Sequence, residues 1–245
     1  ITAFSLGASD GSYSAWTFQP SAWQGGGAYS ETDLTITVNS PEVVAAATYF
    51  QDAVNAGWAY STGDTNADFT AGLSAAMLAS TGGLAGLTTN ITDFEFGTAF
   101  LPEGPAGFGC CTGGAGLGII KASAPEKQAA AFAYAAYKTT PENTATWSQS
   151  TGYMPVRKSA FDAMADFFTA NPNFKVAVDQ LAKTQSQDSA RVQIPNGDQI
   201  IGAALGQIIV GKEDVQSVLD DLAATLTEEA APVIEALQAL ATPTA

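Results

Sequence analysis

Residues 123–162 read SAPEKQAAAFAYAAYKTTPENTATWSQSTGYMPVRKSAFD, and this stretch carries two successive signals for the start of a helix. In each signal a Ser or Thr is followed by a proline and a glutamate, which suit the cap and first turn of a helix. The alanine-rich part predicts a helix that closes near Thr140, and Pro141 begins a shorter helix that ends at Gly152. Helical patterning resumes at Ser159. The stretch therefore predicts a series of helices with short connections.

Outward from this stretch, the sequence predicts more helices mixed with short strands. Residues 1–30 are rich in Gly, Ser and aromatic residues and predict strand and loop, whereas residues 35–38 alternate like a short strand. Pro41 at a first helical position predicts a helix that ends near Gly57. The other expected elements are a turn and helix start at 80–84, a strand at 94–100, a loop at 101–109, helices at 159–168, 174–183 and 200–210, and a last helix at 213–240 that Pro232 should kink or break. Strands mixed with helices of this length indicate an α/β architecture.

Composition limits the classes of function. The chain has 245 residues, of which 46% are hydrophobic, enough for one large domain or two smaller lobes. Acidic residues outnumber basic ones 24 to 9, and the formal charge of -15 opposes the phosphate contacts on which nucleic-acid affinity depends. We therefore expect no nucleic-acid partner and no binding to anionic membranes. Few charged side chains, with many small ones, suit a secreted protein.

Catalytic and metal-binding patterns are weak. The sequence has no histidine, which removes the commonest general base and metal ligand. Asp64–Asp68 resembles the start of a calcium loop but lacks its glycine and closing glutamate, so a helix-capping turn is the interpretation. Gly206–Lys212 has phosphate-loop spacing, but Glu213 replaces the hydroxyl residue and the segment looks like a packed helix. We expect no cofactor and no metal.

Small and aromatic residues give the stronger indications of a binding site. Ser80–Gly83 and Cys111–Ala115 place small residues at element junctions. Such residues either expose backbone N–H groups to a ligand or merely form tight turns. Trp16, Trp23 and Tyr153 suit either an aromatic platform for a sugar or polyol, or the core.

Two further side-chain types leave alternatives open. Arg191 is one of few cations, and its alternative role is a surface ion pair. The adjacent Cys110 and Cys111 are either two small buried residues or a strained vicinal disulfide.

Several segments together resemble family 1 extracellular solute-binding proteins, in particular the branch that binds sn-glycerol-3-phosphate. The matching segments are WTFQPSAWQGGG at 16–27, the spacing of Phe69, Gly72, Ala76 and Met77, ASTGGLAGL at 79–87, GGAGL at 113–117, PEKQAAAFAYAAY at 125–137 and WSQSTGYMPVRKSAFD at 147–162. The resemblance covers nearly the whole chain, and the order and separation of the segments make it specific.

The resemblance implies a two-lobe periplasmic-binding-protein fold of type II character, which closes by a hinge motion. It implies that residues 1–98 form the first part of the C-terminal lobe, that residues 99–141 return into the N-terminal lobe, and that residues 142–245 complete the C-terminal lobe. The first half of the N-terminal lobe is then expected upstream of Ile1.

The resemblance also implies ligand contacts for particular residues. Trp16 or Trp23 would stack on the ligand, and Ser80, Thr81 and Gly82 would donate hydrogen bonds to its phosphate or hydroxyl groups. Gly113 and Gly114 would offer backbone N–H groups from the other lobe, and Tyr153 would bond the same ligand. Ile201 stands where the glycerol-phosphate branch has an arginine that binds phosphate, and Arg191 is the candidate substitute.

The function implied is that of the substrate-binding protein of an ABC importer, which captures glycerol-3-phosphate or a glycerophosphodiester and delivers it to the transmembrane permease subunits. Such a protein is a periplasmic or extracellular monomer, with a lipid anchor in some full-length forms, and not an enzyme. A protein of the same fold that binds a mono- or oligosaccharide or polyol is the alternative. A phosphodiesterase and a lectin-like docking module are the alternatives from other classes, and the absence of histidine disfavours the first.

Overall fold

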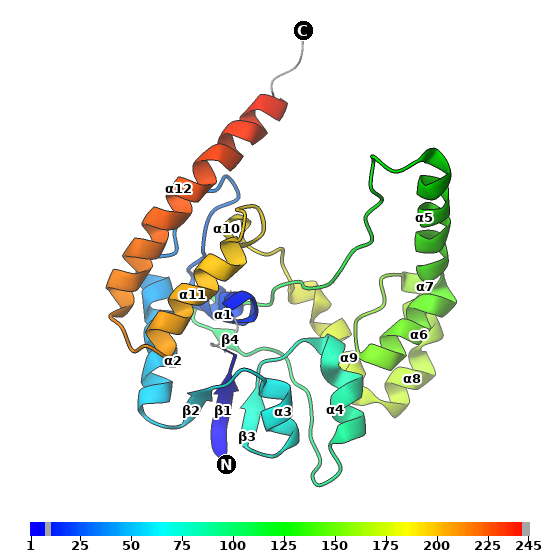
Figure 1. Ribbon diagram of the computed structural model, residues 1–245. Coiled ribbons are helices and arrows are strands. Elements are labelled where there is room, and N and C mark those ends of the chain that lie inside the picture. The colour runs from blue at the N-terminus through cyan, green and yellow to red at the C-terminus, as the bar shows by residue number, and fades with distance from the viewer. Residues whose placement is uncertain (8–10, 242–245) are drawn as a thin grey trace. The chain divides into compact units, whose positions relative to one another are not determined.

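The computed structural model describes residues 1–7 and 11–241, which form two compact units (Figure 1). Unit 1 comprises residues 1–79, 101–112 and 183–245, and unit 2 comprises residues 80–100 and 113–182. The predicted lobe segments 1–98, 99–141 and 142–245 stay a prediction, and the compact units divide the chain at other positions.

Unit 1 is built on a three-stranded parallel sheet. Its central strand is β1 (Thr2–Leu6), which pairs with β2 (Ala59–Ser61) on one side and with β3 (Ser74–Met77) on the other. Parallel neighbours need long crossover connections. These are supplied by α1 (Gly11–Gly25) with α2 (Pro41–Asn55), and then by α3 (Thr65–Thr70).

The helices from the C-terminal part of the chain complete this unit. They are α10 (Ser189–Val192), α11 (Gly197–Ile209) and α12 (Val215–Ala241), of which α11 runs beside α1 and α12 (Figure 1). The largest hydrophobic core joins them to α1 and α2, with Phe18, Ile201 and Leu219 among its buried side chains. Residues that are remote in sequence therefore close one core.

The expectation of strand and loop for residues 1–30 is wrong for residues 11–25, which form α1; residues 8–10 lie outside the described residues. Ala15, Phe18 and Ala22 recur at helical spacing and are buried in the core. Gly and Ser have low helix propensity and Pro20 lacks an N–H group, so local preference disfavours this helix. Burial of one apolar face decides the outcome instead.

Pro20 leaves one carbonyl of α1 without its usual hydrogen bond, and the segment of residues 103–112 supplies a donor. In an α-helix the N–H of residue 20 would donate to the carbonyl of Trp16. The Cys111 thiol instead donates to the Trp16 carbonyl, with Sγ and O 3.5 Å apart.

The same segment lies against the backbone of α1. It contains a short hairpin of β4 (Glu103–Gly104) and β5 (Gly107–Phe108) where a loop was expected. Ala106 N–H donates to Gln24 O at 2.9 Å. A Cβ added at Gly109 would lie 2.2 Å from Pro20 O, so glycine permits the close approach.

Two other expectations differ from the structure, and a third is decided only in part. Residues 35–38 form no strand, and a single bridge joins Ser30 to Ile36 because this segment turns back on itself. Residues 94–100 are irregular, with Thr98 bonded to Asn173 rather than to a sheet. Helix α12 continues through Pro232. In the described residues the helix therefore does not break there, and a kink at Pro232 stays a prediction.

Unit 2 is made of short helices and a small core. They are the 3-10 turn η1 (Thr81–Gly83), α4 (Leu84–Asn90), α5 (Pro125–Lys138), α6 (Pro141–Thr151), α7 (Lys158–Ala163), α8 (Ala165–Ala170), α9 (Pro172–Gln180) and the turn η2 (Leu181–Lys183), whose last residue belongs to unit 1. The predicted starts of α5 and α6 are confirmed, and Gly152 ends α6 in the left-handed conformation. Leu84, Met164, Phe168 and Phe174 form the core. Helix α5 buries no side chain.

The contact between α1 and α11 gives a prediction for stability. A Cβ at Gly202 of α11 would lie 1.6 Å from Gly11 O, so Gly202→Ala must separate the two helices. Overpacking of this kind costs about 3 kcal/mol, and we expect the melting temperature to fall by roughly 6–12 °C. Gly86→Ala in α4 is the control because an added Cβ meets nothing within 4 Å there. If both variants melt like the wild type, the α1–α11 packing described here is wrong.

Candidate ligand-binding site

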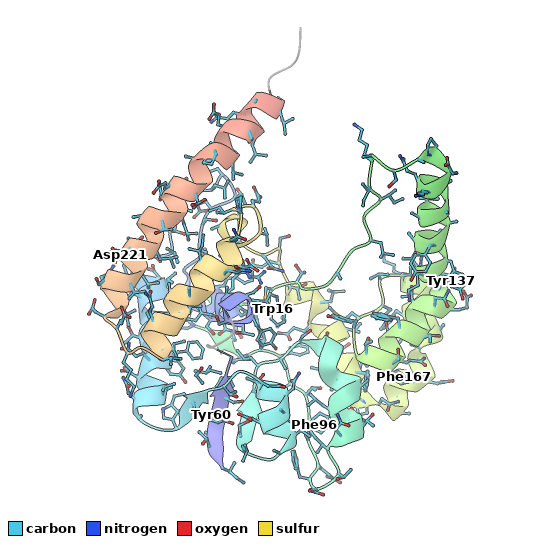
Figure 2. The ribbon with its side chains drawn as sticks, viewed as in Figure 1. Trp16, Tyr60, Phe96, Tyr137, Phe167 and Asp221 are labelled. Atoms are coloured by element: carbon cyan, nitrogen blue, oxygen red, sulfur yellow. The ribbon has the colours of Figure 1, made fainter. Side chains whose placement is uncertain are left out.

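Trp16 on α1 is fixed by a hydrogen bond to the segment that runs along the helix. Its Nε1 donates to Thr112 O at 3.3 Å, and its half-buried ring lies beside the Tyr13 ring with centroids 5.7 Å apart. Figure 2 shows the Trp16 side chain on this helix. An aromatic surface that is half exposed and held at its polar edge suits stacking on a ligand.

Arg191 on α10 is half-buried and is held by neutral groups. Its guanidinium donates from Nη1 to Gln187 Oε1 and from Nη2 to Ser12 O, the latter at 3.2 Å. Across residues 1–7 and 11–241, the ion pair within 4.0 Å joins Lys175 to Asp179, so no carboxylate in these ranges neutralises Arg191. Within these ranges the guanidinium therefore has neutral hydrogen-bond partners, in a chain whose net charge is -15.

Trp23 is held by a different acceptor. Its Nε1 donates to Asp188 Oδ1 at 2.9 Å, and the backbone N–H of Tyr29 donates to Asp188 Oδ2 at 2.7 Å. Burial raises the pKa of the Asp188 carboxyl, while these two hydrogen bonds oppose the rise. Asp188 precedes α10 as its N-cap residue, yet its side chain makes no capping bond because both oxygens bind elsewhere. The carboxylate therefore connects α1 with the loop that follows it.

Ile201 lies in the hydrophobic core of unit 1 with 1% of its surface exposed. A side chain at this depth does not reach a ligand at the surface. Arg191 is therefore the residue that stays a candidate for binding phosphate.

Unit 2 brings together two of the segments expected to bind ligand. Gly82 packs directly against the Tyr153 ring, since an added Cβ would lie 2.4 Å from Cζ of that ring. A Cβ at Gly152 would similarly meet Thr81 O at 2.2 Å. Ser80 Oγ accepts a hydrogen bond from Gly82 N at 3.2 Å, which occupies the N–H that was expected to face a ligand. Tyr153 is 37% exposed.

Gly113 and Gly114 are exposed. The φ of Gly114 is +150°, and a Cβ added there would meet nothing within 4 Å. Within unit 2 the structure does not bring Gly114 against the turn at residues 80–82.

Both cysteines are free thiols, which agrees with the simpler of the two interpretations. Cys111 is buried and Cys110 is half-buried. Burial raises the pKa of the Cys111 thiol to about 12, so this group stays protonated and can donate to Trp16 O. The role of Cys111 is therefore structural.

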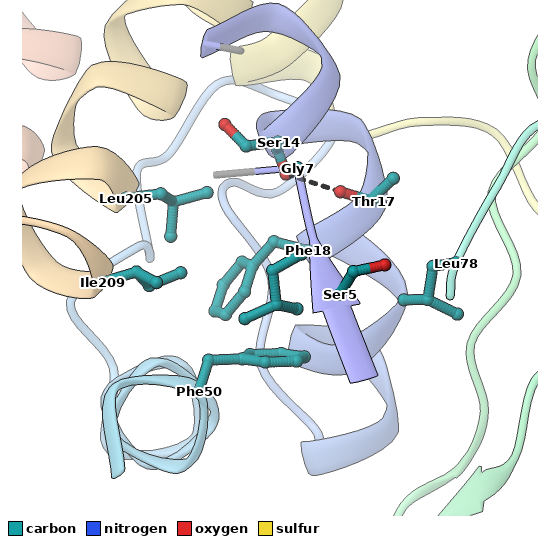
Figure 3. Close-up of a pocket in the computed structure, with 10 residues that line it drawn as sticks. Ser5, Gly7, Ser14, Thr17, Phe18, Phe50, Leu78, Leu205 and Ile209 are labelled. Atoms are coloured by element: carbon teal, nitrogen blue, oxygen red, sulfur yellow. Dashed lines mark hydrogen bonds between the residues drawn. The ribbon is translucent and has the colours of Figure 1, made fainter. Parts of the chain in front are cut away.

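A cavity in unit 1 is too small for a nutrient. It lies between β1, α1, α2 and α11 and has a volume of about 20 Å³ (Figure 3). Phe18, Phe50, Leu205 and Ile209 line its apolar side. This volume suits about one water molecule.

The described residues contain no cluster of three or more His, Cys, Asp or Glu side chains suited to a metal ion. In the same ranges no helix has the length and apolar character that crossing a membrane requires. The turn at Asp64 caps α3, with Asp64 Oδ1 accepting from Ala67 N at 2.9 Å, as the sequence predicted.

The sequence predicted roles for Trp16, Trp23 and Arg191 but not for the neighbours that hold them in unit 1. Thr112 O, Gln187 and Asp188 carry the hydrogen bonds. Asp188 before Ser189 reads as an ordinary helix cap, and nothing local marks Gln187. Only the chain's path in three dimensions identifies them.

The architecture matches part of the fold seen in solved structures of two-lobe binding proteins. A structure of UgpB from Mycobacterium tuberculosis, solved in complex with glycerophosphocholine, has a TM-score of 0.82 and 34% identity over 93% of this chain and 58% of that chain. The sugar-binding protein MalE from Xanthomonas citri has a TM-score of 0.74 at 17% identity, over 99% of this chain and 61% of that chain, which shows the fold alone.

The chain belongs to the family of bacterial extracellular solute-binding proteins, whose model matches residues 3–176. The sn-glycerol-3-phosphate-binding periplasmic protein UgpB of Escherichia coli K12 is 27% identical over 221 residues, which are 85% of this chain and 50% of that protein. This chain therefore spans about half the length of the curated relatives it matches. The predicted family and the two-lobe fold are confirmed.

The hydrogen bonds of Asp188 give a prediction for the stability of the protein. Asp188→Ala leaves Trp23 Nε1 and Tyr29 N without their acceptor, and we expect a loss of about 1–3 kcal/mol in the free energy of unfolding. Urea unfolding followed by tryptophan fluorescence measures it. Asp221→Ala, at an exposed position on α12, should change stability by less than about 0.5 kcal/mol. Equal effects of the two substitutions would contradict this role of Asp188.

Cys111 gives a prediction for thiol reactivity. At pH 8 a thiol with a pKa of about 12 is ionised in about one molecule in ten thousand, and the thiolate is the reactive form. We expect iodoacetamide to leave Cys111 unmodified in the native protein and to label both cysteines in urea, as read by mass spectrometry. Native labelling of Cys111, or a mass lower by two hydrogens, would instead indicate an accessible thiolate or a vicinal disulfide.

Proposed function

We propose that this chain is part of the substrate-binding protein of an ABC importer and that it captures glycerol-3-phosphate or a glycerophosphodiester. The observation that carries the phosphate assignment is the half-buried guanidinium of Arg191, which has neutral partners and no carboxylate within 4.0 Å in the described ranges. A guanidinium recognises phosphate through a planar fork of N–H donors. The relative bound to glycerophosphocholine, at 34% identity, supports the same ligand class.

The proposed ligand contacts are given for each unit by itself. In unit 1, Arg191 would bind the phosphate and Trp16 or Trp23 would stack on the ligand. In unit 2, Ser80, Thr81, Gly82 and Tyr153 would bond its polar groups, and Gly113 and Gly114 would offer backbone N–H donors. Gly82 N–H can bind the ligand only after it gives up its hydrogen bond to Ser80 Oγ.

The lobe assignment also stays a proposal. We propose that residues 113–141 of the predicted segment 99–141 belong to the N-terminal lobe, whereas residues 101–112 pack in unit 1, and that this lobe is completed by polypeptide outside these 245 residues. Two observations support this: the chain covers 50% of its curated relatives, and α5 buries no side chain while exposing Phe132, Tyr134 and Tyr137. Helices of globular proteins normally gain their stability by packing one face.

The proposed activity is binding and release without catalysis. The protein would act in the periplasm or at the outer cell surface as a monomer, with or without a lipid anchor, and would deliver its solute to the permease subunits. Nucleic acid is not a proposed partner, because the net charge of -15 repels phosphate chains.

A ligand panel tests this function on the protein expressed with all the sequence that its gene encodes. A ligand that binds only the native state stabilises it by about 2.7 kcal/mol at a concentration of 100 times Kd. We expect the melting temperature to rise with glycerophosphocholine or glycerol-3-phosphate and to stay constant with choline, glycerol and maltose. A rise with sugars alone would replace the phosphate assignment by a sugar or polyol. Hydrolysis of a chromogenic phosphodiester would indicate an enzyme instead.

A further inference from the structure

Gln187 makes two hydrogen bonds that together fix the cation of the proposed site. Its Oε1 accepts from Arg191 Nη1, and its Nε2 donates to Thr112 O at 2.7 Å. Gln187 lies two residues before α10, and Arg191 lies within that helix. One amide therefore ties Arg191 to the segment that runs along α1.

The Thr112 carbonyl also accepts from Trp16 Nε1, at 3.3 Å. A carbonyl oxygen has two lone pairs and can serve both donors. Gln187 and Trp16 thus share one acceptor, which sets Arg191 and Trp16 relative to each other within unit 1. Both of these side chains are proposed to contact the ligand.

The chemistry of an amide explains why this position suits glutamine. A glutamate would also accept from Arg191, but it has no donor for Thr112 O and would neutralise the guanidinium. A glutamine orients the guanidinium and leaves its charge for an anion. In addition, Arg191 Nε is buried and has no hydrogen-bond partner in the described ranges, so one donor of the guanidinium is left unsatisfied there.

We propose that Gln187 is the positioning residue that lets this site bind the phosphate group of its ligand, by holding Arg191 in place without neutralising it. This inference rests on the proposed function, because it takes the phosphate of a glycerophosphodiester as the anion that Arg191 meets.

The test compares three variants of the full gene product by calorimetric titration with glycerophosphocholine. Gln187→Glu places a carboxylate on Arg191, and we expect at least a tenfold loss of affinity. Gln187→Leu removes both hydrogen bonds but adds no charge, so its loss should be smaller, about threefold. Gln185→Glu is the matched control, since it adds the same charge to an exposed side chain two residues away, and its affinity should stay within twofold of wild type.

The outcomes separate a role in charge from a merely structural one. A Gln187→Glu affinity within twofold of wild type overturns the inference, and so do equal losses in Gln187→Glu and Gln187→Leu with equal falls in melting temperature. If Gln187→Glu does not fold, Gln187→Leu decides: a threefold loss at unchanged melting temperature supports the inference, and unchanged affinity overturns it. Absence of wild-type binding to both glycerophosphocholine and glycerol-3-phosphate overturns the phosphate assignment of the proposed function, together with this inference.

Discussion

The carbonyl of Trp16 needs a hydrogen-bond donor because Pro20 has no N–H, and the Cys111 thiol supplies one. Even a partly buried carbonyl loses free energy without a partner, so this contact favours placing residues 104–112 directly along α1. The path is close enough that Gly104 and Gly109 face the helix backbone, where a Cβ would lie 2.5 Å from Gln24 O and 2.2 Å from Pro20 O. Much of the candidate site follows from this arrangement, because Thr112 comes next in the chain and lies beside Trp16.

Three segments that are far apart in sequence therefore meet in unit 1. Backbone bonds join Gln185 to Cys110 and Thr112, which bring the segment before α10 to the same place. Two side chains of this segment then bond different groups. Gln187 reaches Arg191 and Thr112, whereas Asp188 reaches Trp23 and Tyr29. The positions of both tryptophans and of the arginine thus depend on one short segment.

The sequence predicted those parts of the fold that local chemistry determines. Pro125 and Pro141 mark the starts of α5 and α6, and Gly152 marks an end, because caps, prolines and left-handed glycines act over a few residues. Helix α1 was not predicted, because its composition disfavours a helix and its stability comes from burying Phe18 and its neighbours against α11. Arg191 was identified as a rare cation, but its neutral partners were not, since Gln187 and Ser12 are ordinary residues until the fold brings them to it.

The net charge of -15 makes the neutral hydrogen-bond partners of Arg191 more informative. Acidic groups at the surface repel an anion, but salt screens charges that are more than about 8–10 Å apart in solution. A half-buried guanidinium is screened less, and its hydrogen bonds act only at contact. Recognition of an anion by this protein would therefore depend on local geometry rather than on long-range attraction. A single added carboxylate beside Arg191 would matter far more than the same charge elsewhere on an already acidic surface, and an amide at position 187 meets that requirement.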